Sequence, residues 1–171
     1  INRFWTLNCN FGWNKFLLLF FILHSFNSQS HTLMTTPPVL QKGDTIAILA
    51  TARKNIDDNL QPAIDLLHSW GLEVVIGNTI GLDNNQLAGT DEQRAADFQK
   101  QLDNPNVKAI WCVKGGYGTV RIIDLLDFTK FKQHPKWIVG FSDITVLHNH
   151  LNTMGFKSIH GVWDWLLKEC K

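Results

Sequence analysis

The segment Trp137-Ile-Val-Gly-Phe-Ser-Asp-Ile-Thr-Val-Leu-His-Asn-His-Leu151 joins a short apolar run directly to a helical pattern. Gly140-Phe-Ser-Asp143 separates the two parts, and beyond it apolar residues recur at i, i+3 and i+7: Ile144, Leu147 and Leu151. This pattern predicts a buried strand over residues 137–141 that turns sharply into a helix over about residues 142–154.

Ser142 stands at the turn between this strand and this helix. A strand that enters a helix through Gly-x-Ser is typical of a nucleophile elbow, which lifts a serine hydroxyl clear of the sheet. The same turn directs helix N–H groups at the reacting centre. Serine is also among the preferred residues at a helix N-cap. On the local pattern alone the N-cap is the simpler interpretation, and the nucleophile is the alternative.

Strand and helix patterns alternate along the chain from Lys42 onward. Short apolar or β-branched runs predict strands at 45–49, 73–76, 109–113 and 137–141, and a fifth beginning near residue 158. Amphipathic patterns predict helices at 57–70, from 90 to about 102, at 119–126 and at 142–154. Thr90-Asp-Glu-Gln93 has the pattern of a capping box. This alternation indicates an α/β fold with a mainly parallel sheet and flanking helices.

Lys114-Gly-Gly-Tyr-Gly118 directly follows the third predicted strand. Because ligands bind outside the carboxyl ends of parallel strands, this loop and Gly140–Asp143 should share one rim of the sheet. The loop could form a tight turn, a phosphate site or half of an oxyanion hole. A nucleotide site is disfavoured because the sequence lacks both GxGxxG and GK[ST]. Acyl transfer needs two donors for the oxyanion, and the N–H of Asp143 would supply the second.

Composition excludes several classes of protein. The 171 residues are 44% hydrophobic and carry a formal charge of +1, which fits one folded domain. No basic cluster indicates nucleic acid as a partner. Cys9, Cys112 and Cys170 have neither metal-ligand nor CxxC spacing, so we expect no metal, no disulfide framework and a reducing compartment.

Residues 1–33 differ from the remainder of the chain. They are rich in aromatic residues and Asn, and the apolar run Phe16–Leu23 is too short to span a bilayer. That run has the length of a signal-peptide core, yet no Ala-x-Ala-like site follows it. We expect residues 1–33 to be extraneous to the fold, with a signal or anchor segment as the alternative. We expect the α/β domain at residues 34–171 and no stable membrane association.

Four motifs occur in order along the chain: Lys42-Gly-Asp-Thr-Ile-Ala47, the run from Ala109 to Asp124, Gly140-Phe-Ser-Asp-Ile-Thr145 and Ile159-His-Gly161. Together they resemble the LD-carboxypeptidase family of serine peptidases. The resemblance covers about residues 40–161 and includes muramoyl-tetrapeptide carboxypeptidases and microcin-immunity peptidases. It implies a cytoplasmic hydrolase that uses no cofactor and removes the terminal D-Ala from murein tetrapeptide during cell-wall recycling. It also implies homodimers, and a C-terminal domain beyond residue 171 that carries the Glu and His of the triad.

The resemblance assigns roles to particular residues. Ser142 becomes the nucleophile, with the backbone N–H groups of Gly116 and Asp143 as oxyanion donors. Tyr117 and Arg121 become candidate substrate-binding residues. Arg121 and Lys114 could pair with a substrate carboxylate, and a structural ion pair is the alternative for both.

Other residues near these motifs have simpler interpretations. His148 and His150 lie six and eight residues past Ser142, so we expect them at the surface, away from the turn. His160 is expected to line the substrate-binding site or to have a structural role. Thr119 is expected to cap a helix, and Cys112 is expected to be buried and inert.

Two departures from the family pattern leave other functions open. The first strand leads into Ala50-Thr-Ala52 where the family has Ala-Pro-Ser, and Gly161 is followed by Val where the family has Pro. The alternatives are a non-catalytic α/β module whose glycine loop binds an anion or peptide carboxylate, and a defunct, truncated product. Because a serine without its base is a weak nucleophile, we expect little peptidase activity from the 171 residues alone.

Overall fold

The structure is a computed structural model that describes residues 33–56 and 59–161. The expectations for residues 1–32 and 162–171 lie outside the described residues. Five strands form one sheet in which every neighbouring pair is parallel, as the sequence predicts. Their order is β2-β1-β3-β4-β5, with bounds β1 Thr45–Leu49, β2 Glu73–Ile76, β3 Val107–Cys112, β4 Trp137–Gly140 and β5 Ile159–His160.

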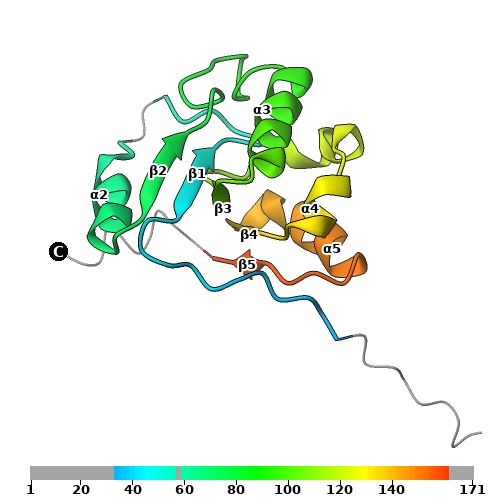
Figure 1. Ribbon diagram of the computed structural model, residues 1–171. Helices are drawn as coiled ribbons and strands as arrows, with labels where there is room; N and C mark the ends of the chain where they lie inside the picture. Colours follow the sequence, from blue (N-terminus) through cyan, green and yellow to red (C-terminus); the bar gives the residue numbers. More distant parts are fainter. Residues whose placement is uncertain (1–32, 57–58, 162–171) are drawn as a thin grey trace, which may run out of the picture. The chain divides into compact units, whose positions relative to one another are not determined.

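Helices cover both faces of the sheet (Figure 1). On one face α2 (Gln61–Ser69) packs its buried side chains against Ile46 and Ile48 of β1. On the other face lie α3 (Asp91–Asp103), α4 (Thr129–Gln133) and α5 (Thr145–Thr153), packed against Ala47 and Leu49. Successive side chains of β1 point to opposite faces of the sheet, so each face contributes alternate residues of β1 to its own hydrophobic core.

The chain changes its direction of travel across the sheet at β1. The chain passes from β1 to its neighbour β2, then crosses to β3 on the other side and continues outward through β4 and β5. In open parallel sheets, ligands bind at the carboxyl ends of strands near such a reversal. The segments that follow β1, β3 and β4 all leave the sheet at this rim, two of them as expected from the sequence.

The ends of several elements differ from the sequence-based expectation. The helix expected at 57–70 begins at Gln61, because Pro62 fits the first turn, where its missing N–H is not needed. The helix expected at 119–126 is two 3-10 turns, Thr119–Arg121 and Ile123–Leu125, in a β-branched run of low helix propensity. Their tighter period buries Ile122 and leaves Val120 exposed.

The first turn of α3 forms the capping box that the sequence predicts. The Thr90 hydroxyl accepts a hydrogen bond from the Gln93 backbone N–H at 3.3 Å, and the Gln93 side chain accepts one from the Thr90 N–H at 2.8 Å. Phe98 and Leu102 are buried as expected. Among the helices of residues 33–56 and 59–161, none is long and apolar enough to cross a membrane.

Candidate active site

The turn between β4 and α5, residues Gly140–Asp143, is called the serine turn below. Ser142 has φ +57°, in the left-handed region that a serine rarely adopts. A Cβ at Gly140 would lie 2.8 Å from the Ile144 side chain, so the turn needs glycine there. Backbone held in this region costs roughly 1–3 kcal/mol and is typical of functional sites.

The hydroxyl of Ser142 is exposed and forms no hydrogen bond with any residue in the described part of the chain. Ser142 is the first residue of a 3-10 turn, Ser142–Ile144, and Phe141 holds the N-cap position in extended conformation. The N-cap interpretation of Ser142 is therefore wrong. Its side chain is left available for chemistry at the rim.

The glycine loop, residues Lys114–Gly118, lies directly against the serine turn. A Cβ at Gly115 would stand 3.0 Å from the Asp143 backbone nitrogen and 3.1 Å from the Ser142 Cβ. Oδ2 of Asp143 accepts hydrogen bonds from the N–H groups of Gly118 and Thr119, both at 2.8 Å. One carboxylate therefore fixes the glycine loop to the serine turn, a role that the sequence analysis did not assign.

Two backbone donors at this junction are unused. In residues 33–56 and 59–161, the N–H groups of Gly116 and Asp143 donate to no other residue. Gly116 itself has φ +121°, which a residue with a side chain rarely adopts. Free N–H groups in two segments that touch are a suitable cradle for a negatively charged oxygen.

The segment after β1 supports the glycine loop from its other side. The hydroxyls of Thr51 and Thr119 are 2.9 Å apart, so Thr119 pairs with Thr51 and does not cap a helix as expected. A Cβ at Gly118 would come within 2.7 Å of the Ala52 Cα. No local pattern in the sequence predicts this support, which comes from Ala50-Thr-Ala52, a segment that departs from the family pattern.

His148 is not the surface residue that the sequence suggests. Its Nε2 lies 2.9 Å from the Gly140 carbonyl oxygen and its Nδ1 lies 2.8 Å from the Ser158 hydroxyl. A carbonyl only accepts, so Nε2 carries the proton and Nδ1 accepts from Ser158. Burial lowers the pKa of His148, as does nearby His160, and the bond to Gly140 only partly opposes this. His148 therefore supports the serine turn as a neutral imidazole.

The remaining candidates divide between structural and exposed positions. His150 packs against the Phe128 ring at 4.8 Å between centroids. Arg121 donates from Nε to Asp91 at 2.9 Å and forms an ion pair with the same carboxylate, which is the structural alternative considered above. Tyr117 is 79% exposed on the glycine loop. Cys112 is buried, and burial raises the pKa of its thiol to about 12, so it stays protonated and inert.

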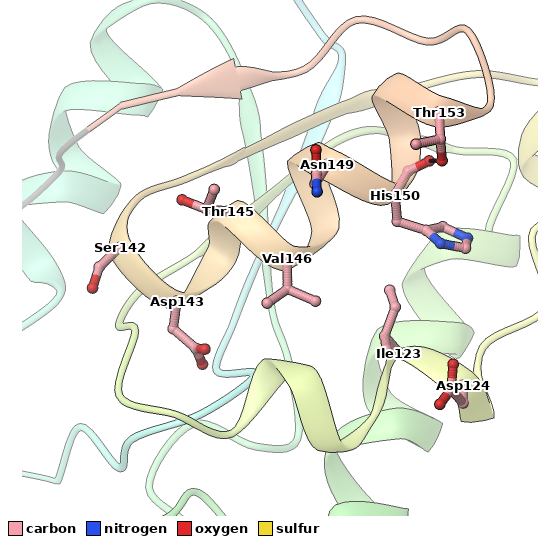
Figure 2. Close-up of a pocket in the computed structure, with 9 residues that line it drawn as sticks. All are labelled: Ile123, Asp124, Ser142, Asp143, Thr145, Val146, Asn149, His150 and Thr153. Atoms are coloured by element: carbon pink, nitrogen blue, oxygen red, sulfur yellow. Dashed lines mark hydrogen bonds between the residues drawn. The ribbon is translucent and has the colours of Figure 1, made fainter.

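An open pocket of about 480 Å³ begins at the serine turn and follows the exposed side of α5. Figure 2 shows Ser142 and Asp143 at one end and His150 and Thr153 at the other. Seven of its nine lining residues have polar side chains, Asp124, Ser142, Asp143, Thr145, Asn149, His150 and Thr153, and the other two are Ile123 and Val146. Within the described ranges no three metal-ligating side chains cluster, in this pocket or elsewhere.

A family model for the N-terminal domain of LD-carboxypeptidases matches residues 46–161. The chain belongs to the LD-carboxypeptidase family. A probable murein peptide carboxypeptidase of Bacillus subtilis (strain 168) is 39% identical over 127 residues, or 73% of this chain and 40% of that protein. The chain thus spans about two fifths of the length of this LD-carboxypeptidase relative.

Solved structures of the LD-carboxypeptidase family share the fold. The crystal structure of muramoyltetrapeptide carboxypeptidase from Oxalobacter formigenes matches with a TM-score of 0.58 and 36% identity, covering 67% of this chain and 38% of that one. The microcin C7 self-immunity protein MccF in complex with aspartyl sulfamoyl adenosine matches with a TM-score of 0.65 and 25% identity, covering 72% and 37%. Family members therefore differ in the molecules that they bind.

Proposed function

We propose that this chain carries the nucleophile of a serine-type LD-carboxypeptidase that removes the terminal D-Ala from murein tetrapeptide. The observation that carries the proposal is Ser142, an exposed hydroxyl at φ +57° in a Gly-x-Ser turn pressed against a glycine loop. An exposed serine at a sharp strand-to-helix turn supports the proposal of a nucleophile elbow. Membership of the LD-carboxypeptidase family supports it.

In the proposed reaction, Ser142 Oγ attacks the carbonyl carbon of the L,D-peptide bond. The carbonyl oxygen becomes an oxyanion held by the N–H groups of Gly116 and Asp143. The C–N bond then breaks, D-Ala leaves with a proton on its nitrogen, and an acyl-serine remains. Water hydrolyses that ester and restores the Ser142 hydroxyl. Tyr117, exposed on the glycine loop, is proposed to contact the substrate.

The base that takes the proton from Ser142 is assigned by resemblance to the family. In residues 33–56 and 59–161 no histidine or carboxylate forms a hydrogen bond with the Ser142 hydroxyl. Both nitrogens of His148 are engaged with Gly140 and Ser158. We therefore propose that a Glu and a His of a C-terminal domain complete the triad. Cytoplasmic location and a homodimer are proposed on the same basis.

The purified 171-residue protein is expected to release little or no D-Ala from murein tetrapeptide, because its described residues place no base at Ser142. Release of D-Ala would be followed by mass spectrometry, with Ser142→Ala as the matched variant. Rapid release that Ser142→Ala abolishes would show that the base lies within the 171 residues. Rapid release that Ser142→Ala leaves unchanged would refute the assignment of the nucleophile.

A second candidate is a non-catalytic module that binds an anion or peptide carboxylate. The two unused N–H groups at Gly116 and Asp143 favour it, because they need only a negatively charged oxygen. This candidate predicts peptide binding that survives Ser142→Ala together with an unreactive Ser142. The alternative of a defunct product predicts no cooperative unfolding.

A further inference from the structure

Arg53 lies beside the glycine loop, four residues beyond the end of β1. Its backbone N–H donates to the Gly115 carbonyl oxygen at 3.2 Å, and it forms an isolated antiparallel bridge with Leu87. The backbone of Arg53 is therefore held on both sides. Its side chain starts from a fixed point at the rim that carries Ser142.

The side chain of Arg53 runs over Gly116. A Cβ at Gly116 would meet the Arg53 Cβ at 2.9 Å, Nε at 3.3 Å and Cδ at 3.6 Å. A larger residue at 116 would push the arginine away, quite apart from the strain at φ +121°. The guanidinium thus begins next to the residue whose N–H is the proposed oxyanion donor.

The charge of Arg53 is not neutralised by the described residues. In residues 33–56 and 59–161, no carboxylate forms an ion pair with Arg53, whose side chain is exposed. By contrast, Arg94 and Arg121 share the carboxylate of Asp91. A guanidinium keeps its charge at every physiological pH and presents a fork of N–H donors that matches a carboxylate.

We propose that Arg53 binds the terminal carboxylate of the peptide substrate and so selects the last residue of a chain for cleavage. This inference rests on the proposed function. In a substrate cleaved before its last residue, the scissile carbonyl and the terminal carboxylate belong to neighbouring residues, whose Cα atoms are about 3.8 Å apart. With the oxyanion at Gly116, the carboxylate falls within reach of the side chain that lies over Gly116.

The test measures binding in the 171-residue protein carrying Ser142→Ala, which removes the proposed nucleophile. The ligands are N-acetyl-L-lysyl-D-alanine and its C-terminal carboxamide, titrated by calorimetry. A charge-assisted hydrogen bond from Arg53 should make the carboxylate bind on the order of tenfold more tightly than the amide. Adding Arg53→Gln should bring this ratio close to one and leave the affinity for the carboxamide unchanged.

Lys54→Gln is the matched control, because it removes the same charge from the neighbouring residue, whose side chain pairs with Asp83. It should keep the tenfold ratio. The proposal is overturned if the protein with Arg53 already binds the carboxylate and the carboxamide with nearly equal affinity. It is also overturned if Arg53→Gln leaves the ratio of the two affinities unchanged, whether or not it weakens the binding of both ligands.

Failure of the proposed function gives a different result. Reaction of Ser142 with a fluorophosphonate is measured separately on the protein that retains Ser142. If carboxylate selectivity depends on Arg53 while Ser142 is unreactive, the Arg53 site stands and the non-catalytic module is favoured over the hydrolase. If Ser142 reacts and the selectivity is independent of Arg53, the hydrolase stands and the Arg53 site is refuted.

Discussion

Asp143→Ala is expected to slow the reaction of Ser142 with a fluorophosphonate by on the order of 10²-fold, the usual cost of losing one oxyanion donor. The Asp143 carboxylate holds the N–H groups of Gly118 and Thr119 at 2.8 Å each. Without it, the glycine loop loses its bond to the serine turn, and the N–H of Gly116 loses its position relative to that of Asp143. The rate would be followed by intact-protein mass spectrometry.

Two variants separate this effect from a simple change of charge. Asp143→Asn keeps an oxygen that can accept from the same two N–H groups, so it should recover much of the rate. Asp124→Ala removes a carboxylate from the lining of the same pocket and should leave the rate within about twofold, because Asp124 forms no hydrogen bond to the glycine loop in the described residues. Equal rates for Asp143→Ala and the unmodified protein would contradict the proposed role of the carboxylate.

Arg94→Leu is expected to lower the free energy of unfolding by about 3–5 kcal/mol, the range for breaking a buried charged network. Arg94 is fully buried, and its guanidinium donates to the carbonyl oxygens of Thr51 and Gly89 and to Asp91. Leucine satisfies none of these acceptors. The substitution would remove the hydrogen bond to Thr51 and so destabilise the segment after β1 that supports the glycine loop.

Arg121→Leu is the control for Arg94, because it removes a guanidinium from the same Asp91 carboxylate. Arg121 is about half exposed, with a side-chain exposure of 53%, so its ion pair should contribute less than about 1 kcal/mol. Both variants would be unfolded in urea with fluorescence detection. A loss below about 1 kcal/mol for Arg94→Leu would contradict the structural role given to Arg94.

The sheet was predictable because its strands are short apolar runs that local sequence patterns reveal. Four of the five residues of Thr45–Leu49 are buried. The capping-box pattern at Thr90 predicts the residue at which α3 begins. The short helix α4 was missed because its five residues contain no repeat of an apolar pattern. The helix predicted at 119–126 is two 3-10 turns, because its β-branched run has low helix propensity and because the Asp143 carboxylate, 25 residues from Gly118, binds the first N–H groups of that segment.

The candidate site was predictable only where a single motif contains the chemistry. Ser142 and the glycine loop follow from local patterns and from their place at the ends of strands. The contacts that organise them are non-local: Asp143 to Gly118, His148 to Gly140, and Arg53 to Gly115. No local pattern marks Arg53, because its proposed role depends on the fold, which brings an exposed charged side chain against Gly116.

Reaction of the protein with a fluorophosphonate tests the central assignment, the serine turn as a site of nucleophilic chemistry, most directly. Attack by Oγ forms an O–P bond, expels fluoride and releases the hydroxyl proton to water, and the phosphoryl oxygen takes the place proposed for the oxyanion. In a serine protease that lacks a triad member, the oxyanion hole and substrate binding still leave roughly 10³–10⁴-fold catalysis over water, so we expect Ser142 to react slowly without its base. We predict one adduct, on Ser142 by peptide mapping, that is absent in Ser142→Ala and after unfolding in urea. No adduct, or one on another residue at the same rate in Ser142→Ala, would contradict the assignment.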